Sequence, residues 1–150
     1  MSDKKNNDCV RIEVDASFVQ IGDDIKAGIA AVLQDNETGE AVFAVGKSIN
    51  CRDNQMAELY AILYALEEIP QNGCTVELFN DSQDAIGLIN GEITCPERYF
   101  EVAQKIRNRV RQKKLTVTFV WRPRTEQSVA DALSTLAARK AENEEIRAKI

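Results

Sequence analysis

The sequence has no histidine, and its four cysteines are widely spaced without a Cys-x-x-Cys pair, so the usual ligands of a zinc site are missing. The same spacing argues against a small domain held by disulfides, and it predicts a reducing compartment such as the cytoplasm. No apolar run reaches membrane-spanning length, and residues 1–8 lack the apolar core of a signal peptide. We therefore expect a soluble, cytoplasmic protein without a membrane partner.

The 150 residues are sufficient for one hydrophobic core, since 44% of them are hydrophobic and 29% are charged. The sequence shows neither internal repeats nor a low-complexity linker that would separate two domains. We expect one domain over residues 9–140. A disordered polar tail at 1–8 precedes it, and a charged helical tail at 141–150 follows it.

Positive charge is concentrated in one segment, although the chain as a whole carries a net charge of -5. Residues 105–124 contain no acidic side chain and eight basic ones: Lys105, Arg107, Arg109, Arg111, Lys113, Lys114, Arg122 and Arg124. Such a segment can bind the phosphates of a nucleic acid, or it can form the solvated face of a helix. The sequence alone leaves both interpretations open.

Hydrophobic periodicity predicts an α/β fold. Residues 10–18 alternate apolar and polar side chains, as a strand does, and two further apolar runs follow across turn-rich segments. These three strands favour an antiparallel meander. Helical and strand patterns then alternate, with helices expected at 54–67, from Ser82, from Pro96 and at 129–137, and strands at 75–79 and 115–121. This order predicts a mixed sheet covered by helices.

The helix at 54–67 is apolar almost all round, which is typical of a buried helix, yet it carries Glu58 near its start. Glu58 shares a stripe with apolar side chains, so its carboxylate faces packed structure and needs a partner that offsets the loss of hydration. The alternative is that Glu58 only favours the positive end of the helix dipole, with Asp53 or Asn54 as the helix cap.

Three more carboxylates lie next to apolar segments. Asp15 is in the middle of the first strand, where Asp is disfavoured, whereas Asp81 follows the fourth strand and Asp131 begins the last helix. Two of them have a simple structural explanation. Asp81 can serve a turn before Ser82, and Asp131 fits a capping box that begins at Ser128.

If Asp15, Glu58, Asp81 and Asp131 meet in one site, a cation must compensate for their mutual repulsion. An all-oxygen set of ligands without His or Cys suits a hard ion such as Mg²⁺ or Mn²⁺. Two such ions can activate a water and stabilise the leaving oxygen in phosphodiester hydrolysis. The four carboxylates are therefore candidates for a metal site.

These residues fall into four motifs that resemble, in the same order, those of type 1 ribonuclease H, in the short form of plant and reverse transcriptase-like members. The resemblance runs from Val10 to Ala138. The motifs are Asp15-Ala-Ser17 with Ala27-Gly28-Ile-Ala-Ala-Val-Leu33, Asn54-Gln-Met-Ala-Glu58-Leu, Asn80-Asp81-Ser82, and Pro123-Arg124 with Ala130-Asp131-Ala-Leu133. Each motif is weak alone, but four in the right order are specific.

The resemblance implies a ribonuclease H-like, five-stranded mixed sheet flanked by helices. It implies an endonuclease that uses two Mg²⁺ ions, with Mn²⁺ as a substitute, to cleave the RNA strand of an RNA/DNA hybrid and leave 3′-hydroxyl and 5′-phosphate ends. The implied metal-binding and catalytic residues are Asp15, Glu58, Asp81 and Asp131. The implied substrate-binding residues are Asn54, Gln55, Ser17, Ser82 and Arg124, of which the two amides match positions that reach the minor groove of the hybrid. For these amides the alternative is a cap and an exposed helix start.

Three features depart from the family pattern. The histidine that many members carry in the loop before the last helix, thought to aid proton transfer or product release, is missing here. Asp53 occupies a position where some members have a phosphate-contacting Thr, and its charge would repel a phosphate. The basic handle insertion of many bacterial members is also missing, and the basic run at 105–114 is its candidate replacement. We expect these changes to affect turnover and affinity more than metal binding.

Two other functions compete with the nuclease. The first is a ribonuclease H-like module that binds nucleic acid or protein without turnover, but such a module has no use for four repelling acids. The second is a proofreading-type exonuclease on a related fold, which would require Asp-x-Glu on the first strand, where this chain has Glu13-Val14-Asp15. A metal-dependent ribonuclease H is therefore the leading hypothesis.

Overall fold

The structure is a computed structural model that describes residues 9–35, 37–51, 53–69, 73–123, 128–140 and 145–149. The expected tail at 1–8 and the loop residues 124–127, which include Arg124, lie outside these ranges. None of the described helices combines the length and the hydropathy that spanning a bilayer requires.

The predicted mixed α/β fold is confirmed, with one strand more than expected. In the described residues six strands form one sheet in the order β5-β4-β1-β2-β3-β6. The antiparallel meander consists of β1 (Cys9–Ile21), β2 (Asp24–Gln34) and β3 (Ala41–Ile49). On the other side of β1, β4 (Thr75–Asn80) and β5 (Thr116–Trp121) run parallel to it because a helical segment precedes each of them.

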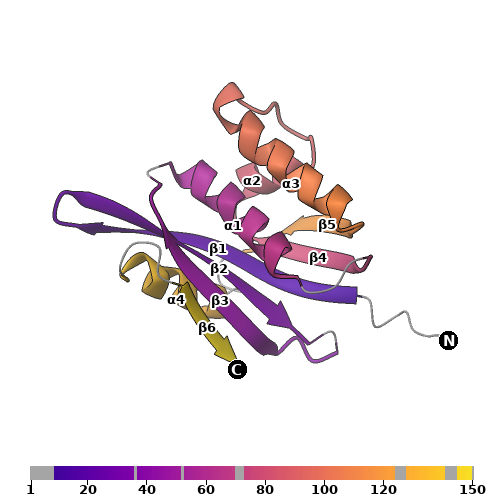
Figure 1. Ribbon diagram of the computed structural model, residues 1–150, viewed down its shortest axis with the longest axis horizontal. Coiled ribbons are helices and arrows are strands. Elements are labelled where there is room, and N and C mark those ends of the chain that lie inside the picture. The colour runs from indigo at the N-terminus through magenta and orange to yellow at the C-terminus, as the bar shows by residue number, and fades with distance from the viewer. Residues whose placement is uncertain are drawn as a thin grey trace.

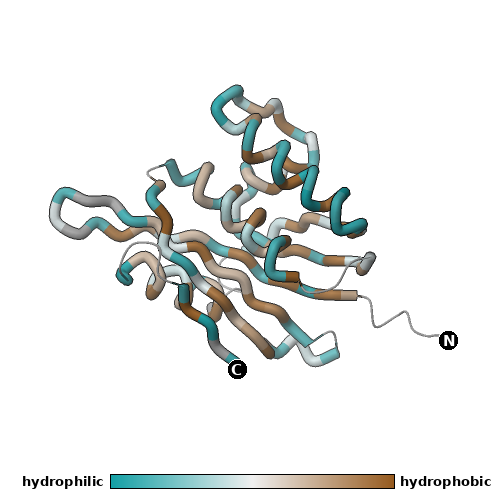
Figure 2. Tube along the Cα trace, in the orientation of Figure 1, coloured by the Kyte–Doolittle hydropathy of each residue, from teal (hydrophilic) through white to brown (hydrophobic). Residues whose placement is uncertain are grey.

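Helices cover both faces of this sheet. As Figure 1 shows, α1 (Asn54–Glu68), α2 (Gln83–Ile89) and α3 (Phe100–Gln112) lie on one side, and α4 (Ser128–Ala138) lies on the other. A short 3-10 turn, η2 (Glu97–Tyr99), leads into α3. The main core lies between the sheet and α1, where the even-numbered apolar residues of β1 contact the helix. In Figure 2 apolar residues run along the central strands and α1, whereas hydrophilic and hydrophobic residues are mixed along α3. Only Val102, Ala103 and Ile106 of α3 are buried, as expected for an amphipathic surface helix.

The ends of α1 are fixed by side chains from outside the helix. At its start Asp53 acts as the cap, since its Oδ1 accepts a hydrogen bond of 3.1 Å from the backbone N–H of Met56. At its end the Lys113 ammonium group donates to the carbonyls of Leu66, Glu67 and Ile69 at 2.7 to 3.1 Å. These carbonyls have no partner within the helix, so Lys113 supplies the missing donors.

The opposite face packs differently, because α4 approaches the sheet very closely. A Cβ atom added to Gly28 of β2 would lie 2.0 Å from the carbonyl oxygen of Ser134 and 2.4 Å from the backbone nitrogen of Ala138. Only glycine fits at this position. The apolar contacts under α4 form a small separate cluster around Val32 and Ala44. On this face the odd-numbered residues of β1, among them Asp15 and Ser17, point toward α4.

The expected helical tail at 141–150 is wrong for the part that is described. Residues Glu145–Lys149 form β6, which pairs antiparallel with the edge of β3. The local charge pattern favours a helix, but the edge of β3 offers unpaired backbone groups, and tertiary contacts decide the outcome. Glu145 accepts a hydrogen bond of 3.1 Å from Tyr64, and Arg147 donates to Glu68 at 2.9 and 3.1 Å, so both side chains tie β6 to α1.

A candidate metal and active site

Three of the four predicted carboxylates come together where β4 ends beside β1. Asp15 from β1, Glu58 from α1 and Asp81, which directly follows β4, each place an oxygen within 4.8 Å of the other two. Asp15 is fully buried, and the other two are half-buried. Two oxygens on opposite sides of one Mg²⁺ stand about 4.2 Å apart, so this group has the dimensions and the all-oxygen chemistry of a hard-cation site.

Asp131, the fourth candidate, stands apart from this group. It lies in the first turn of α4 and is half-buried, as expected for a residue that begins the last helix. Among the described residues the group within 4.8 Å contains only the other three carboxylates. Ser134 links Asp131 to the group, because its hydroxyl lies 2.9 Å from the Asp131 carbonyl oxygen and 3.1 Å from Asp15 Oδ2.

Glu58 is held by a buried amide. The Asn80 side chain donates from Nδ2 to the Val14 carbonyl at 2.9 Å and to Glu58 Oε1 at 3.0 Å, and its Oδ1 accepts from the Ser82 N–H at 2.9 Å. Asn80 is completely buried, so these bonds are protected from water. The expectation that Glu58 needs a partner on its buried side is confirmed, and this amide is one such partner.

Trp121 supports the segment that carries Asp81. Its indole N–H donates to the Asp81 carbonyl oxygen at 3.1 Å, although the ring itself is 43% exposed. Asp81 lies between the last residue of β4 and Ser82, the cap of α2, which accepts from the Ala85 N–H at 3.1 Å. The backbone of Asp81 is therefore held from β5, while the capping contact fixes the residues that follow it.

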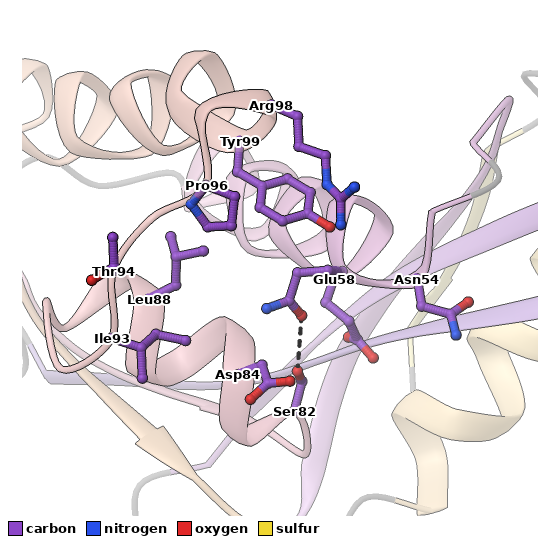
Figure 3. A pocket seen from close by; sticks show the side chains of 11 residues that line it. Asn54, Glu58, Ser82, Asp84, Leu88, Ile93, Thr94, Pro96, Arg98 and Tyr99 are labelled. Atoms are coloured by element: carbon purple, nitrogen blue, oxygen red, sulfur yellow. Dashed lines mark hydrogen bonds between the residues drawn. The ribbon is translucent and has the colours of Figure 1, made fainter.

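Asn54, Gln55 and Ser82 line a groove beside the carboxylates. This open cavity of about 520 Å³ lies between the start of α1, α2 and the segment that leads into η2, and Figure 3 shows Glu58 at its edge. Asn54 is exposed, and Asp53 performs the capping, so the alternative role of Asn54 as the helix cap is wrong. Ser82 caps α2, as expected, and its hydroxyl lies 3.4 Å from Gln55 Oε1.

Asp53 is occupied by contacts within the chain. Both of its oxygens accept from the Tyr99 hydroxyl at 2.9 Å, and Oδ2 lies 3.5 Å from Arg98 Nε. Partial burial alone would raise the pKa of Asp53, but the Met56 N–H, the Tyr99 hydroxyl and the Arg98 charge outweigh it and lower the pKa. Asp53 is therefore an ionised structural group that joins α1 to η2.

The structure turns Ser17, a predicted substrate contact, toward the protein interior. Its hydroxyl lies 2.8 Å from Ser134 Oγ and 3.1 Å from Thr135 Oγ1, both on α4. Arg124, the other predicted contact on this side, lies outside the described residues. Ser17 thus connects β1 to α4 in addition to any role toward a ligand.

Three supporting residues were not identified from the sequence: Asn80, Trp121 and Ser134. Asn80 stood within a recognised motif, but nothing in the linear pattern indicates that its amide reaches a helix 22 residues earlier in the chain. Ser134 carried a usable signal, since its spacing of three from Asp131 places both on the same face of a helix. Trp121 ends an alternating strand, and its contact with Asp81 depends on the parallel pairing of β4 and β5.

The chain is similar to a known protein family and to several solved structures. The model of the reverse transcriptase-like family matches residues 13–137, whereas no curated protein matches the chain. Among solved structures, LC11-RNase H1, isolated from compost by a metagenomic approach and crystallised with an RNA/DNA hybrid, is 26% identical with a TM-score of 0.77, over 88% of this chain and 98% of that one.

RNase H1 from the halophilic archaeon Halobacterium salinarum is 25% identical with a TM-score of 0.61, over 85% of this chain and 96% of that one. The prototype foamy virus protease-reverse transcriptase is 18% identical with a TM-score of 0.65, over 89% of this chain and 21% of that one, which shows a shared fold. Since the family model spans most of the chain and the structural neighbours include RNase H1 proteins, this chain belongs to the reverse transcriptase-like, RNase H-like family.

Proposed function

We propose that the chain is a metal-dependent endoribonuclease that hydrolyses the RNA strand of RNA/DNA hybrids and leaves 5′-phosphate ends. The observation that carries this proposal is the meeting of Asp15, Glu58 and Asp81 within 4.8 Å on an RNase H fold. Acids that repel one another lower the stability of a protein that binds no cation. Their convergence is therefore best explained by a function that needs a cation.

In the proposed site Asp15, Glu58 and Asp81 would hold the metal, and Asp131 would complete the set from the start of α4. When bound, two Mg²⁺ ions supply an activated water and stabilise the charge on the leaving 3′ oxygen, and Mn²⁺ is expected to substitute. The role of the protein is to hold the carboxylates in place. Asn80 orients Glu58, Ser134 contacts Asp15, and Trp121 fixes the Asp81 backbone.

The groove next to the carboxylates is the proposed place for the hybrid. Asn54 and Gln55 stand in it with amide groups that can donate to and accept from base edges and 2′-hydroxyls in a wide minor groove. Arg98 adds a positive charge at the rim, and its side chain is 70% exposed. Ser82 would contact the sugar-phosphate backbone of the hybrid close to Asp81, since both residues lie just before α2.

The test is cleavage of labelled RNA/DNA hybrid, double-stranded RNA and double-stranded DNA, each with Mg²⁺ or with EDTA. We expect cleavage of the hybrid alone, dependent on the metal, with 5′-phosphate ends. Asp15→Asn, Glu58→Gln and Asp81→Asn should each lower the rate by at least about 10³-fold, because each removes a metal ligand. Without metal these variants should be at least as stable as the wild type, because a repelling charge is gone.

Asp23→Asn is the matched control, because Asp23 is exposed in the turn between β1 and β2 and stands outside both the groove and the carboxylate group. It should retain activity within a few fold. Hybrid binding without cleavage at any pH, in a protein that still binds Mg²⁺, would contradict the nuclease and favour a module that binds nucleic acid without turnover. Full activity of one carboxylate variant would remove that residue from the site.

A further inference from the structure

Ser134 occupies a place where β1 and α4 meet beside the carboxylates. Its side chain is completely buried and lies one turn after Asp131. The hydroxyl oxygen is 3.1 Å from Asp15 Oδ2, 2.9 Å from the Asp131 carbonyl oxygen and 2.8 Å from Ser17 Oγ. A single buried hydroxyl therefore touches the carboxylate of one candidate metal ligand and the backbone of another.

The direction of these hydrogen bonds follows from the number of protons. A serine hydroxyl has one proton to donate, and an ionised carboxylate can only accept. The Asp131 carbonyl has its regular helical donor in the N–H four residues later. The Ser134 proton is thus best placed toward Asp15, and its lone pairs are left to accept from Ser17.

The hydroxyls of this region then form a chain that points at Asp15. Thr135 Oγ1 lies 3.1 Å from Ser17 Oγ, which lies 2.8 Å from Ser134 Oγ. When each hydroxyl donates to the next, the last proton faces Asp15 Oδ2. Hydrogen bonds to a charged acceptor in a buried place are stronger than those between neutral groups, so this chain holds the carboxylate firmly.

We propose that Ser134 is a positioning residue for the metal site: its hydroxyl fixes the Asp15 carboxylate and sets it at a defined distance from the start of α4, where Asp131 lies. The inference rests on the proposed function of the carboxylates as metal ligands. Groups that orient metal ligands typically change metal affinity by about 10 to 100-fold when they are removed. The close approach of α4 at Gly28 is what lets so short a side chain reach Asp15.

The experiment is calorimetric titration of the purified chain, without nucleic acid, with Mn²⁺ and with Mg²⁺. We expect Ser134→Ala to bind the metal about 10-fold more weakly than the wild type. Its hybrid cleavage should fall at low Mg²⁺ and recover as Mg²⁺ is raised, because the ligands themselves remain.

Ser48→Ala is the matched control. Ser48 is buried on β3, and its hydroxyl donates to the Ala137 carbonyl, so it docks the same helix without contacting a carboxylate. This variant should lose stability comparable to that lost by Ser134→Ala and keep the metal affinity of the wild type. Equal loss of metal affinity in both variants would show that Ser134 only docks α4, and it would overturn the proposal.

A second variant keeps the test decisive if Ser134→Ala does not fold. Ser17→Ala removes the hydroxyl that donates to Ser134 and leaves Ser134 in place, so we expect a smaller loss of metal affinity in the same direction. Unchanged metal affinity in Ser134→Ala overturns the positioning role but leaves the proposed metal site standing. If only Ser17→Ala folds, unchanged metal affinity in that variant has the same meaning. A wild type that binds neither ion overturns the proposed metal site and this inference with it.

Discussion

At the scale of single residues, the candidate site is distinguished by how its acids are supported. Glu58 is contacted by an amide, Asp15 by a hydroxyl, and the Asp81 backbone by an indole N–H. Each of these donors is neutral, so it orients its partner without supplying a positive charge that would compete with a metal ion. The supporting side chains come from β4, α4 and β5, which explains why the whole fold is needed to form the site.

Asp53 gives a prediction about pH. Its pKa in the folded protein is lowered from the ordinary value of 3.8. Its contribution to stability is therefore present above that value and is lost as the pH falls through the lowered folded pKa. We expect the difference in unfolding free energy between the wild type and Asp53→Asn to be constant near pH 6 and to shrink below pH 3.8. Urea denaturation across this range measures it, and a difference independent of pH would contradict it.

Some residues of the candidate site could be predicted from the sequence, whereas the contacts that support them could not. Asp15, Glu58 and Asp81 could be found because each is an acid next to apolar residues, and the resemblance to a family placed them in order. The hydrogen bond between Ser134 and Asp15 joins residues 119 apart, so no local pattern contains it. Asp53 was expected to repel phosphate. Its contacts with Tyr99 and Arg98 could not be predicted, because they depend on how η2 packs against the start of α1.

At the scale of elements, α1 depends on one cation at its end. Lys113→Met keeps the length of the side chain but removes the donor to three carbonyls. We expect a loss of about 1 to 3 kcal/mol in unfolding free energy, because the partly buried carbonyls of Leu66 and Ile69 lose their charged donor. Lys105→Met on the exposed face of α3 is the control, and it should change stability by less than about 0.5 kcal/mol. A loss no larger than that of the control would show that water replaces the ammonium group.

The arginines of α3 differ in their surroundings, so only some of the basic run is available to bind a nucleic acid. Arg109 donates to Glu67 of α1 at 2.9 Å, so it ties the two helices together. Arg107 and Arg111 are exposed. We expect Arg107→Glu combined with Arg111→Glu to weaken hybrid binding and to reduce the dependence of log affinity on log salt by about two.

Arg109→Gln should lower stability and leave hybrid affinity nearly unchanged, which makes it the control for the charge reversal. Fluorescence anisotropy with a labelled hybrid at several salt concentrations separates the two effects. If the double reversal leaves both affinity and salt dependence unchanged, the basic run is the solvated face of a helix.

Most helices and strands could be predicted from the sequence, but the strand β6 could not. The alternation in β1 and the all-round apolar pattern of α1 reflect burial on one face or on all sides, which the sequence records directly. Glu145–Lys149 alternates over only five residues and is rich in charge. It is a strand because the edge of β3 is available to it, and that availability is a property of the folded sheet.

At the scale of the whole molecule, β6 forms one edge of the sheet beside β3 (Figure 1), and β2 and β3 separate it from β1, which carries Asp15. Removal of residues 141–150 should lower the unfolding free energy, because the backbone pairing with β3 and the contacts of Tyr64 and Glu68 are lost. The bare edge of β3 should also promote association between chains. Thermal denaturation and sedimentation velocity measure both effects. Hybrid cleavage per folded molecule should persist, and its loss would show that β6 acts on α1 and Glu58.

The small residues of the sheet that face α4 affect how the position of this helix is determined. Gly28, Ala30, Gly46 and Ser48 lie side by side on β2 and β3 and leave almost no side-chain relief there. Helices usually find their position along a neighbour because ridges fit into grooves, but a smooth surface would let α4 slide along the strands at little cost. The hydrogen bonds of Ser17, Ser48 and Ser134 are directional, so they fix the position of α4 along the strands. The axial position of Asp131 is thus determined by hydrogen-bond lengths, which vary by tenths of an ångström, and not by the looser fit of apolar surfaces.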